Sequence, residues 1–276
     1  MNKADKYYKK NLLKIKNDGC FDENPRPKYK DGVEAYSKFI TQVYEEYDIS
    51  KEEYPIPTLR KTAIKTGIKE ILWIYQKQSN SLDVAHDMGI TWWDNWNIGD
   101  NTIGQRYGHT IKKYNLMNKL LYDLEYNPFS RRHIIDMYQY EEFEKSEGLY
   151  PCAFQTIWSV RRKNDNLILD LTLFQRSNDY IMAGYINKIQ YVALQMMVAG
   201  HLNYKIGTFC HFTQNVHVYD RHFDAMEEIL NIKSLDIQPK LILKDKKKFY
   251  NYSISDFEIV NIDNIKNINS SLELAI

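Results

Sequence analysis

The sequence is poor in features that mark several classes of protein. It has three cysteines, Cys20, Cys152 and Cys210, too few and too scattered for a disulfide framework or a zinc site. We therefore expect reduced thiols, no metal and a cytoplasmic location. The first residues, "MNKADKYYKKNLLKIKNDG", lack the apolar core of a secretion signal, and no apolar run approaches the ~18 residues of a membrane span.

An excess of charge of one sign is also missing. Lys and Arg number 37 against 36 Asp and Glu, a net charge of +1, so no strong field favours nucleic acid or a membrane as partner. No internal repeat, low-complexity block or Pro/Gly/Ser linker divides the chain. We expect a single domain over residues 1–276.

Apolar residues at helical spacing are present in four segments. Residues 4–18 end before Gly19, which suits a glycine cap, and residues 110–125 show a second helical pattern. In residues 62–78 one side of the predicted helix carries Ala63, Ile64, Ile68, Ile71, Leu72 and Ile74. Residues 187–202 are apolar almost all round, which predicts a buried helix.

Strand patterns fill the second half of the chain. "FQTIWSV", "LILDLTLF" and "GTFCHFTQNVHVY" alternate or are rich in β-formers, and "LILKD" follows near residue 241. Helices and strands do not alternate strictly along the chain. We therefore predict an α+β fold with a mostly β core.

Cys152 lies between a proline and a predicted strand in "LYPCAFQTIWSV". A thiol is a nucleophile only as the thiolate, which needs positive charge nearby. Arg176, Arg131 and Arg132 are the candidates for that charge. A lone cysteine beside a strand is more often buried filler, so both interpretations of Cys152 stay open at this level.

The arginine motifs also allow two interpretations. In "QRSND" Arg176, Ser177 and Asp179 follow a strand, where a guanidinium and a hydroxyl could hold a phosphate or simply form a polar turn. The adjacent pair Arg131 and Arg132 in "SRR" is usually a solvated patch. Together the two motifs offer three arginines and a serine to a dianion.

Aromatic and histidine residues suggest the rest of a nucleotide site. His217 and Tyr219 in "HVYDRH" point to the same face of a strand and could bond a sugar hydroxyl or each other. Trp93 and Trp96 in "TWWDNW" are either core or an aromatic wall for a flat heterocycle.

The order "SRR", "PC", "QRSND…N", "HVY" resembles the thymidylate synthase family over almost the whole chain. "IKEILWIYQ…TWWDNW…IGQRYG" is similar to that family's upstream half, and "RPKY" to its phosphate loop, with "RP" in place of "RT". The final "AI" and "SND" are similar to the divergent form of bacilli and their phages. The resemblance implies a large mixed β-sheet with flanking helices and a homodimer formed through the sheet.

The implied reaction moves a one-carbon unit from 5,10-methylenetetrahydrofolate to carbon-5 of deoxyuridylate (dUMP), giving thymidylate (dTMP) and dihydrofolate. Carbon-5 is a poor nucleophile, and thiolate addition at carbon-6 converts the ring into an enolate that can attack the folate. By the resemblance Cys152 is that thiol. Arg176 is expected close to it, lowering its pKa and holding the phosphate.

The resemblance also implies the rest of the nucleotide site. Arg26 and Ser177 would complete the phosphate site, and Arg131 and Arg132 would reach it from the second subunit, making the dimer obligatory. The substrate-binding residues implied for base and sugar are Gln175, Asn187, His217 and Tyr219. Asn187 would accept from the ring N–H and donate to the neighbouring carbonyl, which favours uracil.

The folate side and the proton transfers are implied in the same way. Glu70 would manage proton transfers through water, and Tyr107 would lie near the carbon-5 proton. The residues implied to bind folate are Trp93, Trp96, Asp179 and Ile276.

Departures from the family pattern motivate an alternative. Ala153 replaces a common histidine, Gln214 and Asn215 replace "GD", and Ile262 aligns with a tyrosine expected to help bind the sugar. Looser packing there would let water capture the exocyclic methylene, giving 5-hydroxymethyl-dUMP in a hydroxymethylase. The retained Trp93 and the "AI" end favour hydride transfer in a closed pocket.

A third hypothesis is a catalytically dead binder, for example of RNA or with a regulatory role. The intact set Cys152, Arg176, Asp179, Asn187 and Glu70 disfavours it.

Overall fold

The computed structural model describes residues 1–276 and is built around one six-stranded mixed sheet. Its strand order is β1-β2-β6-β5-β4-β3, with β5 and β6 parallel and every other neighbouring pair antiparallel. The strands are β1 (Cys20–Phe21), β2 (Ser37–Asp48), β3 (Ile134–Asp136), β4 (Ala153–Lys163), β5 (Asn166–Asp179) and β6 (Lys205–Tyr219). The predicted α+β class with a large mixed sheet is confirmed.

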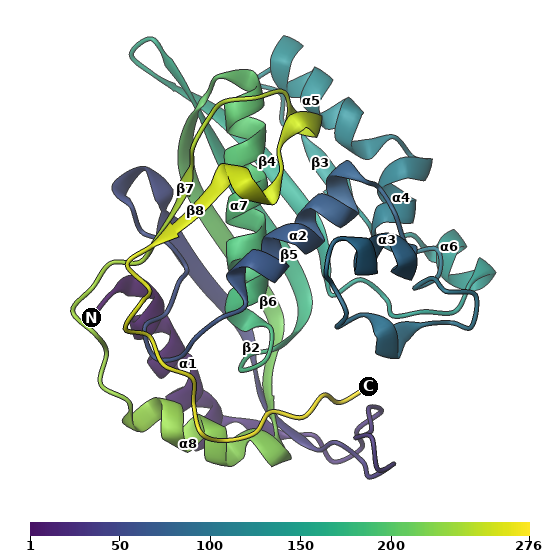
Figure 1. Cartoon of the computed structure of the whole chain (residues 1–276), viewed down its shortest axis with the longest axis vertical. Helices are drawn as coiled ribbons and strands as arrows, with labels where there is room; N and C mark the ends of the chain where they lie inside the picture. Colours follow the sequence, from purple (N-terminus) through teal and green to yellow (C-terminus); the bar gives the residue numbers. More distant parts are fainter.

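Helices cover one face of this sheet (Figure 1). A parallel pair needs a crossover connection, and α7 (Gly184–Leu202) supplies it between β5 and β6. Helix α2 (Ile64–Ile71) continues into a π-helical segment, η2 (Leu72–Gln76), and packs on α7. One cluster of 57 buried apolar residues runs through these layers, so the helices and the sheet share a core.

The remaining elements surround this core. The helices are α1 (Lys3–Asp18), α3 (Leu82–Asp87), α4 (Gly108–Lys113), α5 (Leu116–Tyr126), α6 (Tyr140–Lys145) and α8 (Phe223–Asn231). Strands β7 (Lys240–Leu243) and β8 (Phe257–Val260) form a separate antiparallel pair. None of the helices combines the length and the apolar character needed to cross a membrane.

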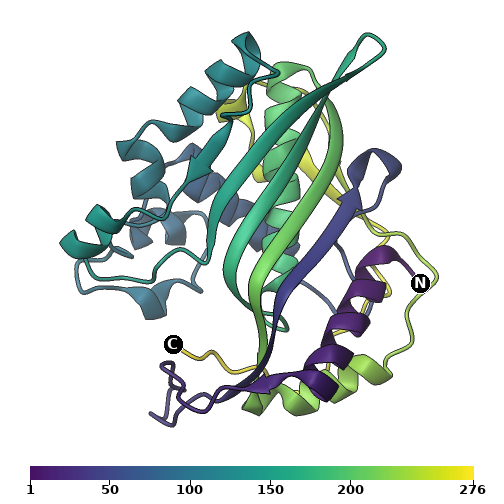
Figure 2. The same cartoon turned by 180° about the vertical axis from the view of Figure 1, so that it is seen from behind.

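The opposite face of the sheet is seen in Figure 2, where the long strands run in front of the helices. Three large apolar side chains are exposed on strands of this sheet: Phe21 on β1, Tyr44 on β2 and Ile134 on β3.

The structure confirms the helices predicted over residues 4–18 and 187–202 and the long strands β4, β5 and β6. The helix predicted over 110–125 is two helices, because Asn115 adopts a left-handed φ of 53° that ends the first one. Gly19 is extended, with φ −66°, so it is not the left-handed cap that we expected. Ala63 is exposed and only precedes α2.

Candidate active site

A cavity of about 670 Å³ opens where the carboxyl ends of β5 and β6 meet the N-terminus of α7. Fourteen of the sixteen predicted site residues line it. They are Arg26, Glu70, Trp93, Trp96, Tyr107, Cys152, Gln175, Arg176, Ser177, Asp179, Asn187, His217, Tyr219 and Ile276. Residues distant in the sequence therefore share one surface, as the motif order predicted.

Cys152 is held in the cavity wall by its backbone. Its N–H donates to the Tyr107 hydroxyl at 3.1 Å, and its carbonyl accepts from the Arg176 N–H at 2.9 Å. The Arg176 guanidinium donates to the carbonyls of Pro151 (3.1 Å) and Tyr150 (2.7 Å). These hydrogen bonds hold the thiol and the guanidinium in fixed positions relative to each other. The guanidinium keeps further N–H groups that can donate to a ligand.

Burial raises the pKa of the Cys152 thiol, while Arg176 and Arg26 act in the opposite direction. We expected Arg176 to lower this pKa. Its own effect has that sign, but the net shift is upward because desolvation outweighs both guanidinium groups. The resting thiol is therefore protonated at neutral pH, and it must lose its proton before it can attack.

Glu70 faces the same cavity from α2 and is buried. Its Oε2 accepts a hydrogen bond of 2.5 Å from the Trp92 indole. Burial raises the pKa of this carboxyl to about 7, although Gln190, Trp93 and Trp92 oppose the shift. A carboxyl that titrates near neutral pH suits proton transfer in both directions.

Tyr107 carries a backbone strain next to this carboxyl. Its φ of 50° is rare for a bulky residue, and the following Gly108 lies so close to Ser79 that a Cβ would stand 2.2 Å from the Ser79 carbonyl oxygen. The Tyr107 ring packs on Trp93 with centroids 5.2 Å apart. Burial raises the pKa of the phenol, so it stays a hydrogen-bonding O–H beside Cys152.

Side-chain amides form a chain at the inner end of the cavity. Gln175 Nε2 donates to the Ser177 carbonyl (2.9 Å) and to Asn187 Oδ1 (3.1 Å), which also accepts from Asn178 Nδ2 (3.1 Å). Asn187 Nδ2 donates to Gln190 Oε1 at 3.1 Å. We expected the Asn187 oxygen to accept from a ring N–H, but both of its lone pairs are occupied, and one amide N–H remains.

His217 and Tyr219 lie side by side on β6, with ring centroids 4.9 Å apart. His217 Nδ1 is 3.0 Å from Asn215 Oδ1, and burial lowers the pKa of the imidazole, so the ring is neutral. Ile262 does not line the cavity and packs against the core instead. The position aligned with the family's tyrosine therefore lies away from the cavity, and the hydroxyl-bearing ring beside His217 is that of Tyr219.

The C-terminal residue closes one side of the cavity. Ile276 N–H donates to the Lys28 carbonyl (2.9 Å), and Lys28 N–H donates to the Ile276 carbonyl (2.7 Å). This pair joins the end of the chain to the loop of Arg26, which lies beside the C-terminus in Figure 1.

Arg131 and Arg132 are the two predicted site residues outside the cavity. Both are exposed on the segment before β3. Within one chain neither reaches the wall formed by Arg26 and Arg176.

Sequence reasoning missed three cavity residues whose side chains hydrogen-bond the predicted ones: Trp92, Asn178 and Gln190. Trp92 bonds Glu70, but "TWWDNW" does not reveal which of three tryptophans faces inward. Asn178 lies in the "SND" motif, and Gln190 is a polar residue on a mostly apolar helix, three positions after Asn187 and thus on the same side.

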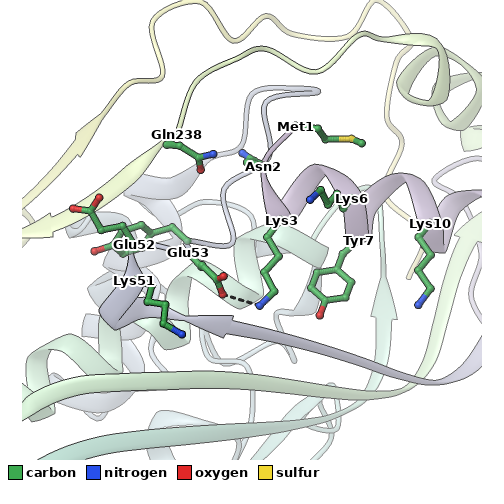
Figure 3. Close-up of a pocket in the computed structure, with 11 residues that line it drawn as sticks. Met1, Asn2, Lys3, Lys6, Tyr7, Lys10, Lys51, Glu52, Glu53 and Gln238 are labelled. Carbon is green, nitrogen blue, oxygen red and sulfur yellow. Dashed lines mark hydrogen bonds and ion pairs between the residues drawn. The ribbon is translucent and has the colours of Figure 1, made fainter.

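A second hollow, of about 590 Å³, lies beside the N-terminal helix (Figure 3). Its walls are mostly polar, and its one drawn ion pair joins Lys3 to Glu53 at 2.7 Å. No predicted site residue lines it. No group of three or more His, Cys, Asp or Glu side chains is placed to hold a metal ion.

The main cavity combines a thiol, guanidinium groups, an aromatic wall, an amide and a carboxyl that titrates near neutrality. Such a set of groups can bind a flat, anionic substrate, supply a cysteine nucleophile and exchange protons, which is the equipment of an enzyme that works by covalent catalysis.

Comparison with known proteins agrees with that class. The thymidylate synthase family profile matches residues 6–274. The thymidylate synthases of Streptococcus gordonii and Streptococcus sanguinis are each 50% identical over 270 residues, covering 96% of this chain and 97% of theirs. The thermostable thymidylate synthase A from Bacillus subtilis superposes with a TM-score of 0.90 at 33% identity, covering 99% of both chains. The chain belongs to the thymidylate synthase family.

Proposed function

We propose that the chain converts dUMP and 5,10-methylenetetrahydrofolate to dTMP and dihydrofolate. The observation that carries this proposal is the meeting of Cys152, Arg176, Asn187 and Glu70 in one cavity of a thymidylate synthase family member. The curated relatives are named thymidylate synthases, and none of the findings favours the hydroxymethylase.

Cys152 is the nucleophile in this proposal. Its sulfur adds to carbon-6 of the uracil ring, and the electron pair moves onto the carbon-4 oxygen as an enolate. Carbon-5 then attacks the folate methylene, one carbon–nitrogen bond of which opens, and carbon-5 loses its proton to water. Cleavage of the remaining bond between the methylene carbon and the folate nitrogen leaves an exocyclic methylene on the ring. Hydride transfer from tetrahydrofolate reduces this methylene to a methyl group and leaves dihydrofolate, and departure of the sulfur from carbon-6 restores the ring double bond and releases dTMP. The raised pKa of the free thiol means that thiolate forms as the reaction begins.

Arg176, Arg26 and Ser177 bind the phosphate. Two of the Arg176 donors are used by Tyr150 and Pro151, which fixes the plane of the guanidinium and aims its remaining donors at the cavity. Arg26 lies on the loop tied to the C-terminus, so phosphate binding and ordering of the tail are coupled.

Asn187 reads the base, with Gln175 as its support. Its remaining amide N–H donates to the carbonyl at carbon-4 of uracil, where cytosine would present another donor. His217 and Tyr219 bind the sugar hydroxyl.

Glu70 exchanges protons with the carbon-4 oxygen and ring through water, and the Tyr107 hydroxyl lies near the carbon-5 proton. Trp93, Trp96 and Asp179 face the folate, and Ile276 with the tail closes over it. A closed, apolar wall favours hydride transfer over attack by water.

The active form is a homodimer in which Arg131 and Arg132 reach the partner's phosphate. The helix-free face of the sheet and its exposed Tyr44 and Ile134 support this proposal. C152A mixed with the R131A/R132A double variant tests it. After subunit exchange in an equal mixture, half of the dimers are heterodimers, and each of these has one complete site of its two. Activity should therefore return to about a quarter of the wild-type value. No regain would mean that both arginines act within their own subunit.

A product assay tests the reaction itself. Purified protein is incubated with dUMP and methylenetetrahydrofolate, dihydrofolate is followed by absorbance, and the nucleotide is identified by mass. We expect dTMP as the nucleotide product, with one molecule of dihydrofolate formed for each molecule of dTMP. A product heavier by one oxygen without dihydrofolate would support the hydroxymethylase, and absence of both products and of a covalent fluorinated-dUMP complex would support a dead binder.

A further inference from the structure

His211 lies in the sheet behind the amide chain and has no part in the reaction described above. It is a β6 residue, 1% exposed, on the side of the strand that faces α7. Its Nε2 is 2.9 Å from Gln175 Oε1 and 3.1 Å from Thr213 Oγ1. A polar ring in that position needs an explanation, because its neighbours on the same side of the strand include the apolar core residue Phe209.

The backbone fixes which way this hydrogen-bond chain runs. The Ser177 carbonyl can only accept, so the end of the Gln175 amide that faces it must be Nε2. Gln175 Oε1 therefore faces His211, and His211 must present an N–H to it. Burial and Lys188 hold the pKa of His211 well below its usual range, so the ring is neutral and its single proton is on Nε2.

The same series of hydrogen bonds determines whether the oxygen or the nitrogen of the Asn187 amide faces the cavity. The second N–H of Gln175 Nε2 goes to Asn187 Oδ1, so the oxygen of Asn187 faces the sheet and its nitrogen faces the cavity and Gln190. Rotation of the Gln175 amide by half a turn would put its oxygen against the oxygen of Asn187, and Asn187 would turn with it. An outward oxygen would accept from the amino group of cytosine instead of donating to the carbonyl of uracil.

We propose that His211 is a positioning residue for base specificity: as the Nε2–H tautomer it holds Gln175, and through Gln175 it holds Asn187 in the orientation that recognises a 4-keto pyrimidine nucleotide and rejects a 4-amino one. This inference rests on the proposed function, because Asn187 must be the residue that reads the base.

The test compares binding of dUMP and dCMP, by calorimetry, to the wild type and to His211→Phe. Phe keeps a ring in the core but removes the donor to Gln175. We expect dUMP to bind about tenfold more weakly, dCMP to bind no more weakly, and kcat with dUMP to change much less than KM. His211→Gln, which keeps an N–H donor, should restore most of the discrimination.

Gln195→Met is the matched control. Gln195 is buried on α7 and its amide bonds the backbones of β5 and β6, but it does not contact the amide chain. Its loss should lower stability and leave the ratio of dUMP to dCMP affinity unchanged. An equal change of that ratio in Gln195→Met and His211→Phe would overturn the inference, since general loosening would then explain it.

Two further results separate this inference from the proposed function. A wild type that neither turns over dUMP nor prefers it to dCMP refutes the proposed function. The second result is a wild type that turns over dUMP and prefers it to dCMP, together with a His211→Phe variant whose ratio of dUMP to dCMP affinity stays within twofold of the wild-type ratio. That result refutes only the role of His211. If His211→Phe does not fold, ¹⁵N NMR of wild-type His211 decides, because a ring protonated on Nδ1 alone contradicts the proposed chain.

Discussion

Two buried glutamates of this protein, Glu45 and Glu70, differ in how many hydrogen-bond donors and cations surround their carboxyl groups. Glu45 on β2 is 1% exposed and accepts from Asn11 (3.1 Å), Tyr47 (2.6 Å) and Tyr180 (2.9 Å), and Lys188 Nζ lies 3.3 Å away. Glu70 is similarly buried but has no cation beside it.

This difference indicates a structural role for Glu45 and a chemical role for Glu70. Glu45 is surrounded by donors on all sides and ties β2 to α1 and α7, so its carboxylate is satisfied as the chain folds. Glu70 has few partners and an open cavity in front of it, and its pKa rises to about 7. A carboxyl left incompletely neutralised is available for proton transfer, at a cost in stability.

The largest expected effect is on turnover in Glu70→Gln. If Glu70 exchanges protons with the substrate as proposed, its removal should lower kcat by about 10²–10⁴-fold, with a much smaller change in KM for dUMP. Steady-state kinetics measures both. Retention of wild-type kcat would remove Glu70 from the mechanism and erase the contrast with Glu45.

The next effect is on folding in Glu45→Gln. This change leaves the Lys188 ammonium buried without its counter-charge, so we expect a loss of about 3–5 kcal/mol in the free energy of unfolding. Urea denaturation measures it, and kcat of the folded fraction should stay within about threefold. The double variant Glu45→Gln/Lys188→Met should recover part of the stability, and failure to do so would show that the ion pair is not the cause.

A third prediction concerns the pH dependence of stability. The folded pKa of Glu70 lies near 7, above the unfolded value of ~4.3, so ionisation opposes folding. Relative to Glu70→Gln, the wild type should lose about 1.4 kcal/mol of stability per pH unit between these values and reach a constant deficit of about 4 kcal/mol above pH 7. Unfolding of both proteins at pH 5, 6, 7 and 8 measures the difference. A constant difference would mean that the Glu70 pKa is not raised.

The smallest effect is expected for Trp92→Phe. Without the indole donor, the charged form of Glu70 is less favoured and its pKa rises further. The fall of kcat on the acid side of its pH profile should therefore move to higher pH by about one unit. Trp96→Phe is the control, since Trp96 lines the same cavity and is not among the hydrogen-bond partners of Glu70. An equal shift in both variants would assign the effect to wall packing.

Part of the fold was readable from local patterns, and part was not. Period-two alternation identified β5 and β6, and continuous apolar character identified α7. The twelve-residue β2 was missed because its buried residues Ile40 and Val43 are three positions apart around Gln42, whose φ is 58°, and because Glu45 is a charged residue on the buried side.

The sequence by itself determined which chemical groups are present and most of the elements that carry them: periodicity predicted the strands β4, β5 and β6, and the family resemblance carried by the motif order implied the roles of Cys152, the arginines and Asn187. Only the tertiary structure decided the raised pKa of Glu70 and of Cys152, and the direction of hydrogen bonding from His211 through Gln175 to Asn187. The physical reason is that spacing encodes local backbone geometry, whereas desolvation and amide orientation depend on contacts among β5, β6, α2 and α7 that form only when the chain folds.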